Sequence, residues 1–308
     1  MPPAIFLPEQ IERIVAAPFT PGDPARILRG GFEGVHSATM GYLLRDALLI
    51  DGVLYKGGSC EHLRPRQAKG LEVRIDEEFD RAAMISTPGG NRYFGQWLLD
   101  DCITYPLAET EGLPVMTNQA KWLHSDGYES WLNMSSKRVG NAIFRELILF
   151  DDVGQNASKK QRRDANRKHL LSHVDYSSHP GVFVLRGTAG ERRVLINELE
   201  IAERLRNTRG FRLVDPMQMT VPEIVAACAG AKTVIGVEGS GLVHAVQLLG
   251  PGDNIVVLQP PTRFVFVFKD IADRDGQNFA FVVGTAVGED FTIDVSDIEK
   301  TLDLLPVS

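Results

Sequence analysis

With 308 residues the chain is long for one hydrophobic core, and because domains usually contain roughly 100–200 residues, its length favours two domains. Its 44% hydrophobic and 24% charged residues are typical of a globular protein and exclude a disordered or collagen-like chain. The formal net charge of −7 argues against a protein that coats nucleic acid, which usually needs a basic domain.

Neither a membrane span nor export is indicated. Runs of about 18 consecutive apolar residues, the length of a spanning helix, do not occur, and the first residues, MPPAIFLPEQIERIV, are broken by prolines and lack a signal-peptide pattern. Cys60, Cys102 and Cys228 lie far apart, without the spacing of a disulfide framework or a zinc site, and the histidines show no metal-ligand spacing. We therefore expect a cytoplasmic protein without a bound metal.

Short strands and one helix are predicted in the first half of the chain. From Ala25 to about Arg74 brief apolar runs alternate with glycines, and Asp51-Gly52 between two of them is a strong hairpin signal. Residues 82–87 then have the pattern of a strand, residues 93–109 have helical periodicity, and residues 146–150 form another buried strand. The strand and helix that begin at residue 82 predict a βα unit.

A basic stretch, SKKQRRDANRKHLLSH, follows at residues 158–173. Six of its residues are Lys or Arg, and few positions are apolar. This composition predicts a solvated helix or a linker. The alternative is a peripheral contact of Lys159–Lys168 with anionic lipid headgroups at the inner membrane face, or with a charged glycan.

Strands and helices alternate regularly from Gly181 to the end. The strand-like runs VFVLR, FRLVD, KTVIGV and NIVVLQ are separated by helical patterns such as NELEIAERLRN and VPEIVAACAG. Strands that alternate with helices at this spacing imply right-handed βαβ crossovers and a parallel sheet. We therefore predict a Rossmann-like second half and a less regular first half over residues 82–150.

The stretch VIGVEGSGLVHA, Val234–Ala245, is a strand that runs through a glycine-rich turn into a helix. Glycines at such a turn let backbone amides approach an anionic group, and the carboxyl end of a parallel strand is a usual place for a ligand. The spacing is G-x-x-G-x-G rather than G-x-G-x-x-G, and no acidic residue ends the next strand, which disfavours an NAD-linked enzyme. The structural alternative is tight packing of the helix on the sheet.

Several segments together resemble glycosyltransferase family 61. They are VFVLRG, RRVLINELEIAERL, FRLVDP and TVIGVEGSGLVHAVQLLGPGDNIVVLQP, in that order, and GGNRYFGQWLLDD at Gly89–Asp101. The resemblance covers roughly Ala82 to Pro261.

The resemblance implies an α/β protein of GT-B-like architecture. Two Rossmann-like domains would hold parallel sheets that face each other across a cleft, preceded by a short β-rich N-terminal segment. We expect residues 1–174 to contain that segment and the acceptor domain, and residues 175–308 to form the nucleotide-sugar-binding domain.

The resemblance also implies an activity. The expected enzyme is a metal-independent hexosyl- or pentosyltransferase that moves a sugar from a nucleotide sugar to a glycan or glycolipid, as in capsule and surface-polysaccharide synthesis, with no cofactor beyond its donor. The alternative is an inactive descendant that binds nucleotide sugars as a scaffold in a glycan-assembly complex.

The residues that match the family define the expected donor site. Arg186 would contact the donor phosphates, although a strand-end arginine is also a common surface residue. Asn197 and Glu198 would bind the donor, or would instead be a helix cap and an exposed first-turn carboxylate. The complete expected set for the donor is Arg186, Arg193, Asn197, Glu198, Gly236, Gly239, Ser240 and Gly241.

Two positions depart from the family pattern. Glu238 stands where the family usually has His in its glycine motif, and Gln96 stands where it usually has His before the tryptophan. An inverting transfer needs a base for the acceptor hydroxyl, and the two candidates are Asp100 and Glu238. Helical spacing places Tyr93, Gln96 and Asp100 on one face, and we expect the acceptor to meet Tyr93, Gln96 and Trp97.

Overall fold

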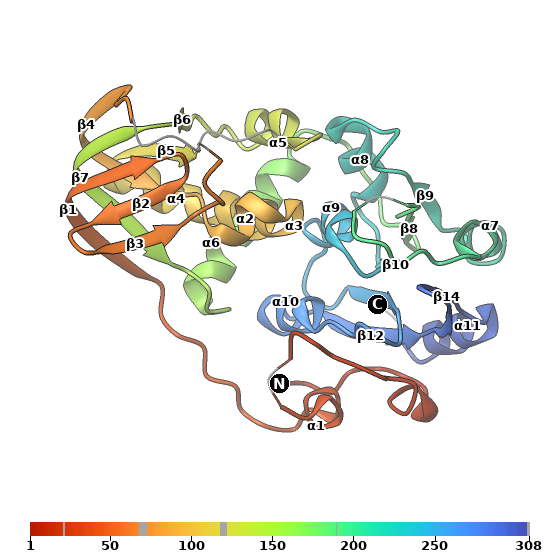
Figure 1. Ribbon diagram of the computed structural model, residues 1–308. Helices are drawn as coiled ribbons and strands as arrows, with labels where there is room; N and C mark the ends of the chain where they lie inside the picture. Colours follow the sequence, from red (N-terminus) through yellow and green to blue (C-terminus); the bar gives the residue numbers. More distant parts are fainter. Residues whose placement is uncertain (21, 68–72, 118–121, 189, 307–308) are drawn as a thin grey trace. The chain divides into compact units, whose positions relative to one another are not determined.

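The structure is a computed structural model that describes residues 1–20, 22–67, 73–117, 122–188 and 190–306 (Figure 1). The chain divides into two compact units. The C-terminal unit contains Met1–Val35 and Leu170–Ser308, and the middle unit contains His36–His169.

Five parallel strands form the sheet of the C-terminal unit, in the spatial order β12-β11-β10-β8-β9. They are β8 (Val182–Val184), β9 (Arg212–Val214), β10 (Thr233–Val237), β11 (Asn254–Gln259) and β12 (Asn278–Val283). Valine, isoleucine and phenylalanine dominate them and are mostly buried, as expected for a parallel sheet covered on both faces. The parallel sheet predicted for this half of the chain is confirmed.

The strand order reverses between β8 and β10. β9 lies on one side of β8, whereas β10, β11 and β12 follow on the other side. Such a reversal is a topological switch point, and open α/β sheets bind their ligands beyond the carboxyl ends of the strands at this point. The sheet therefore has one preferred place for a ligand.

Helices follow the strands of this unit (Figure 1), and apolar side chains of the helices are buried against the sheet. Ile201 and Leu205 of the first helix, for example, belong to one buried cluster with Phe183 and Ile235 of the sheet. The helices are α7 (Glu198–Arg209), α8 (Val221–Cys228), η3 (Ser240–Leu242), α9 (Val243–Val246), α10 (Val267–Asp275) and α11 (Val295–Asp303), and a small hairpin of β13 (Thr285–Val287) and β14 (Asp290–Thr292) precedes the last.

The first 35 residues belong to the C-terminal unit, whereas the sequence placed them with the first domain of residues 1–174. They include η1 (Pro8–Gln10) and α1 (Pro24–Arg29). Ile5 forms a parallel bridge with Ala280 of β12, and Arg13 donates to Asp297 of α11 at 2.6 Å. These partners lie more than 270 residues away along the chain, so local sequence patterns carry no sign of the association.

The middle unit contains one mixed sheet of seven strands in the order β3-β2-β1-β7-β4-β5-β6. Its strands are β1 (Met40–Ile50), β2 (Val53–Lys56), β3 (Ser59–His62), β4 (Glu77–Met84), β5 (Leu113–Thr117), β6 (Lys137–Val139) and β7 (Ala142–Asp151). β7, β4, β5 and β6 are parallel neighbours, and β1, β2 and β3 are antiparallel. The β-rich stretch is therefore part of this sheet, and the expectation of a separate segment before a purely parallel domain is wrong.

The predicted hairpin is confirmed. Ile50 of β1 pairs with Val53 of β2, and the two residues between them, Asp51 and Gly52, have φ of 46° and 78°. Positive φ at both central positions is the geometry of a two-residue turn whose twist matches that of its strands.

The helical segment after β4 is interrupted by a π-turn. Its elements are α2 (Pro88–Arg92), α3 (Phe94–Gln96), the π-turn η2 (Trp97–Asp101) and α4 (Cys102–Glu111), with α5 (Ser125–Trp131) after β5. Pro106 lies inside α4 and has no N–H to donate to Cys102 O. That carbonyl instead accepts a hydrogen bond from Asn166 Nδ2 at 3.1 Å.

The basic stretch forms α6 (Ala157–Leu171), and part of it is buried. Arg162 Nη1 and Nη2 each donate to Asp152 at 2.8 Å, and Arg162 Nη1 also donates to Ile103 O. Lys159, with 0% exposure, donates to Asp152 O at 2.7 Å. The expectation of a wholly solvated segment is wrong for these residues, because carboxylates and carbonyls of the middle unit pair with their charges.

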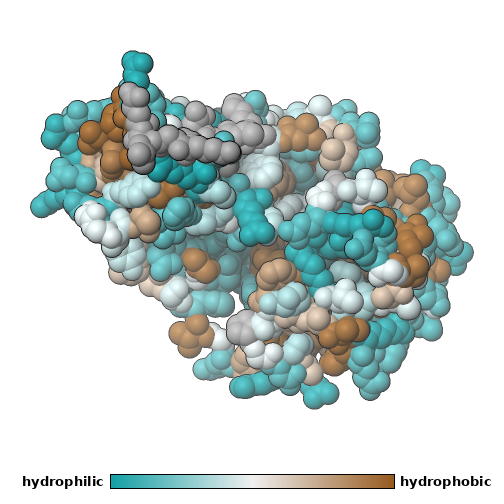
Figure 2. All heavy atoms as spheres, viewed as in Figure 1, coloured by the Kyte–Doolittle hydropathy of each residue, from teal (hydrophilic) through white to brown (hydrophobic). Residues whose placement is uncertain are grey.

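Fewer basic side chains of this segment are therefore accessible for contact with anionic lipids than the sequence indicated. Lys160, Arg167 and Lys168 are partly or fully exposed. On the face drawn in Figure 2, hydrophobic residues are interspersed among hydrophilic ones. Within the described residues, the helices are too short or too polar to span a bilayer.

Candidate functional site

Three arginines and a glutamate gather at the carboxyl edge of the C-terminal sheet. Arg186 follows β8, Glu238 follows β10 and Arg263 follows β11, so parallel strands bring all three to the same edge. Arg193 joins them from the loop between β8 and α7. Arg186 and Glu238 flank the switch point between β8 and β10.

Gly239 lets this group come close to the backbone. Its φ of 146° lies in the region that side chains rarely adopt. A Cβ at this position would lie 3.1 Å from Arg193 Nη2 and 3.3 Å from Arg186 Nε. Glycine therefore allows two guanidinium groups to pack against the turn after β10.

The neighbouring positions of the glycine motif have different surroundings. Gly236 lies inside β10, where a Cβ would be 2.8 Å from Val184 O, so this glycine serves the packing of β10 on β8. Gly241 has no neighbour within 4 Å of its Cβ position among the described residues, and Ser240 beside it is half-buried. Ser240 and Gly241 begin η3, whose first N–H groups lack acceptors within the helix. The turn at Ser240 and Gly241 thus has open space beside it, whereas Gly236 is enclosed by the sheet.

Glu238 is a buried counter-ion of two arginines. Its Oε2 lies 2.7 Å from Arg193 Nε and accepts from Arg263 Nη1 at 2.7 Å. Glu238 is 5% exposed, and a carboxylate at that depth needs such partners. Arg193 also donates to Glu238 O at 3.2 Å, which ties its guanidinium to the turn. The negative charge introduced by Glu238 is therefore balanced within the cluster.

Arg186 has unused hydrogen-bonding capacity. Its Nη2 donates to Glu191 O at 2.6 Å, whereas its buried Nη1 has no partner among the described residues. Burial, followed by the nearby charge of Arg193, lowers the pKa of Arg186 from 12.5 to about 10. The guanidinium remains protonated at neutral pH, and an added anion would relieve the repulsion.

Glu198 and Asn197 hold the loop in place. The two carboxylate oxygens of Glu198 accept from the backbone N–H groups of Arg186 and Gly187, each at 2.8 Å. Burial raises the pKa of Glu198 by more than these hydrogen bonds lower it, so its pKa lies above the usual value. Asn197 Nδ2 donates to Ile293 O at 2.8 Å and makes no side-chain cap for α7. The alternatives of an exposed carboxylate and a helix cap are both wrong.

In the middle unit, Asp100 is paired with a buried lysine. Lys159 Nζ donates to Asp100 Oδ1 at 2.5 Å, and the Asp100 side chain is 30% exposed. Neighbouring Asp101 is 1% exposed and accepts from Thr87 Oγ1 at 2.7 Å. Burial raises the pKa of Asp101 well above its usual value, which favours the neutral carboxyl group. Of the two carboxylates in this turn, Asp100 is the one that is accessible to solvent.

The expected acceptor residues differ in their exposure. Gln96 is exposed and Tyr93 is half-buried beneath the guanidinium of Arg92, 5.0 Å from the ring centre. Trp97 is 1% exposed and packs near Phe94, with ring centres 5.7 Å apart. Trp97 is therefore a core residue of the middle unit, while Gln96 and Tyr93 retain accessible atoms.

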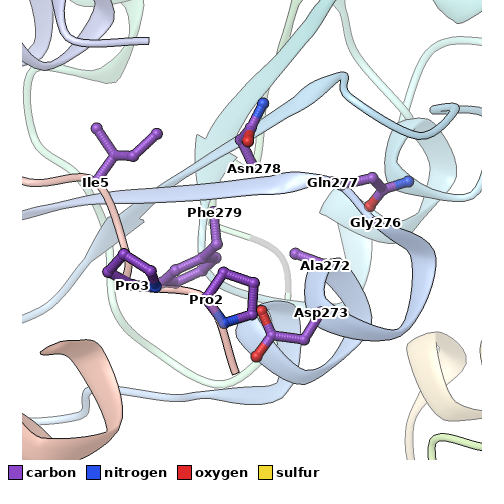
Figure 3. A pocket seen from close by; sticks show the side chains of 9 residues that line it. All are labelled: Pro2, Pro3, Ile5, Ala272, Asp273, Gly276, Gln277, Asn278 and Phe279. Carbon is purple, nitrogen blue, oxygen red and sulfur yellow. The ribbon is translucent and has the colours of Figure 1, made fainter. Parts of the chain in front are cut away.

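A cavity of about 170 Å³ lies at the other edge of the C-terminal sheet, where the strands begin (Figure 3). Phe279 at the start of β12, Ala272 of α10 and the N-terminal Pro2 line it. Its carboxylate, Asp273, is already bonded to Lys269 at 2.5 Å. This cavity is separate from the arginine group, which lies beyond the opposite ends of the same strands.

Arg263 was not among the residues predicted for the site. A signal for it was available, because Arg263 follows the carboxyl end of the strand-like run NIVVLQ and Arg186 closes the run VFVLR at its carboxyl end. Among the described residues, no group of three His, Cys, Asp or Glu is arranged to hold a metal ion.

Comparison with known proteins identifies the family of the chain. A search of curated proteins returned no match. The family model described as Glycosyltransferase 61 matches residues 2–269, which include β8, β10, β11 and the four charged residues at their ends. The resemblance found in the sequence is confirmed: the chain belongs to glycosyltransferase family 61.

Proposed function

We propose that the protein transfers a sugar from a nucleoside-diphosphate sugar to a glycan or glycolipid in the synthesis of a surface polysaccharide. One observation carries the assignment of the donor site: Arg186 and Arg193 flank the glycine turn at the switch point, and Arg186 Nη1 has no partner among the described residues. Guanidinium groups are well suited to bind phosphate oxygens. The donor diphosphate is assigned to this edge of the sheet.

The transfer breaks the bond between the anomeric carbon and the diphosphate oxygen and forms a bond from that carbon to the acceptor oxygen. The diphosphate leaves with the electron pair, and its growing negative charge is stabilised by fixed positive groups. Arg186 and Arg193 fill this role in the proposal. The acceptor hydroxyl gives its proton to a base.

Asp100 is the better of the two candidate bases. Two guanidinium groups contact the Glu238 carboxylate, and the residue is 5% exposed, so it serves as a counter-ion. Asp100 has one oxygen bonded to Lys159 and is 30% exposed. In the proposal Asp100 takes the acceptor proton, and Glu238 keeps the arginines in place.

A second candidate function follows from the same engagement of Glu238. The residue at the family's histidine position, Glu238, is buried and engaged by Arg193 and Arg263. An inactive nucleotide-sugar-binding scaffold would keep the arginines and lose the base. Binding of a nucleotide sugar without transfer to a broad acceptor mixture would favour this function.

Arg186→Ala is expected to weaken nucleotide-sugar binding about 10- to 150-fold, because hydrogen bonds to charged groups contribute about 1.5–3 kcal/mol. Titration calorimetry with the nucleotide sugar that most stabilises the wild-type protein measures the change. Arg192→Ala is the matched control, since Arg192 lies in the same loop but is exposed and paired with Asp290 at 2.9 Å. Equal affinities of wild type and Arg186→Ala would remove Arg186 from the site.

Chelation is expected to leave turnover unchanged. The proposed leaving-group charge is met by Arg186 and Arg193, so a divalent cation has no required part in the step. Initial rates with and without excess EDTA provide the measurement. A loss of roughly tenfold that Mn²⁺ restores would contradict this assignment.

A further inference from the structure

Arg263 is held firmly beside the proposed donor site. It lies in the loop between β11 and α10. The buried side chain of Gln259 fixes this loop, since its Nε2 donates to Val265 O at 2.8 Å. The N-terminal segment fixes it further: Phe264 N–H donates to Ala16 O at 2.9 Å, and the Arg263 guanidinium lies 5.1 Å from the ring centre of Phe19. These contacts leave the guanidinium little freedom to move away.

The two carboxylates that pair with Arg263 differ in burial. Nη1 donates to buried Glu238 at 2.7 Å, whereas Nη2 donates to Glu191 at 3.2 Å. The Glu191 side chain is 53% exposed, and it also lies 3.8 Å from Arg193 Nη1. An exposed ion pair of this kind is weak, because water competes for both groups. Glu191 can therefore leave the arginines at small cost, and Glu238 cannot.

The charges of the cluster match those of a diphosphate once Glu191 has moved. Arg186, Arg193 and Arg263 carry three positive charges, and buried Glu238 cancels one of them. Glu198 is bound to backbone N–H groups at 2.8 Å, and its carboxylate interacts with Arg186 through charge alone. Among the paired groups, two positive charges then remain for the diphosphate of a nucleotide sugar, a diester that carries about two negative charges.

We propose that Arg263 is a third diphosphate-binding arginine, and that the Glu191 carboxylate occupies its outward side until the donor displaces it. The inference rests on the proposed function, because it takes the donor diphosphate to bind at this edge. Glu238 then acts as a positioning residue that aligns Arg193 and Arg263. Glu191 lowers the affinity of the empty site for anions that are smaller or less charged than the donor.

The test is a titration of the full-length protein with UDP, GDP, ADP, the corresponding nucleosides and inorganic pyrophosphate. Arg263→Ala is expected to weaken diphosphate binding about 10- to 100-fold and to leave nucleoside binding unchanged. Arg263→Lys keeps the charge but loses the fork of donors, so its affinity should lie between the two. Arg204→Ala is the matched control, because Arg204 is an exposed arginine of α7 that pairs with Glu299 at 2.9 Å.

Glu191→Gln distinguishes displacement of Glu191 by the donor from a purely structural role, because loss of a structural contact would not tighten diphosphate binding. Loss of the competing carboxylate is expected to tighten diphosphate binding about 2- to 10-fold, and the gain should shrink in the Arg263→Ala background. Glu289→Gln is the control, since Glu289 is an exposed carboxylate that pairs with Arg192. Thermal unfolding midpoints establish that each variant is folded; if Arg263→Ala is not, Arg263→Lys and Glu191→Gln decide the question.

The outcomes separate the two proposals. If the wild-type protein binds none of the diphosphates, the proposed function fails, and this inference fails with it. If the wild type binds them and folded Arg263→Ala or Arg263→Lys binds them equally well, Arg263 is not a contact and only this inference is overturned. Weaker binding by Glu191→Gln would make Glu191 a direct ligand contact and would likewise overturn its displacement.

Discussion

Asp100→Asn is expected to lower turnover by about 10²- to 10⁴-fold, the usual contribution of a general base. Nucleotide-sugar affinity should stay unchanged, because a base for the acceptor hydroxyl does not hold the donor diphosphate in the proposal. Steady-state kinetics with saturating donor and acceptor measure the effect on kcat. Titration calorimetry with the donor measures affinity separately.

The ion pair of Asp100 requires its own control. Lys159 is fully buried, and removal of a partner from a buried pair leaves an uncompensated charge. Lys159→Gln removes the same pair and keeps the Asp100 carboxylate. A loss of turnover in Lys159→Gln as large as in Asp100→Asn would assign the effect to the broken pair and contradict the base.

Asp152→Ala is expected to destabilise the middle unit by about 3–5 kcal/mol, the usual cost of breaking a buried ion pair on one side. Asp152 is 8% exposed and accepts from Arg162 at 2.8 Å, from Thr39 at 2.6 Å and from Thr104 at 3.0 Å. Its removal leaves the Arg162 guanidinium buried without its carboxylate. Guanidinium chloride unfolding, followed by circular dichroism, measures the change.

Asp151→Ala is the matched control, because Asp151 is exposed and adjacent in the chain. Burial raises the pKa of Asp152, but the hydrogen bonds from Arg162 and Thr39 outweigh it, so the net pKa is lowered. A carboxylate with a lowered pKa in the folded state stabilises the fold above its unfolded pKa of about 3.9 and loses that contribution as the pH falls further. The difference between wild type and Asp152→Ala should therefore shrink in acid. A destabilisation below about 1 kcal/mol at neutral pH would contradict a stabilising role of the buried pair between Asp152 and Arg162 of α6.

Local patterns predicted the sheet that carries the proposed donor site. The alternation of VFVLR, FRLVD, KTVIGV and NIVVLQ with helices defined the parallel sheet, and Asp51-Gly52 defined a hairpin. Associations across the chain were beyond such patterns, as the pairing of Ile5 with Ala280 shows. The prediction of a solvated segment was wrong for α6, because composition shows its charges but not the partners of the buried Lys159 and Arg162.

The group of arginines at the edge of the sheet was predicted in part. Residues at strand ends, Arg186 and Gly239, could be found because parallel strands bring their carboxyl ends together. The pairing of Glu238 with Arg193 and Arg263 depends on loop conformation, which the sequence pattern does not specify. Helical spacing grouped Tyr93, Gln96 and Asp100, and Trp97 was expected to meet the acceptor as well. A π-turn at Trp97–Asp101 interrupts the regular helix, and Trp97 is buried.

A crystal structure of the protein with a bound nucleoside diphosphate shows whether the arginines bind the donor diphosphate. We expect phosphate oxygens within about 3 Å of guanidinium nitrogens of Arg186 and Arg193, beside Gly239 at the carboxyl ends of β8 and β10. Phosphates bound elsewhere, for example in the cavity lined by Asp273 at the opposite ends of the strands, would contradict it.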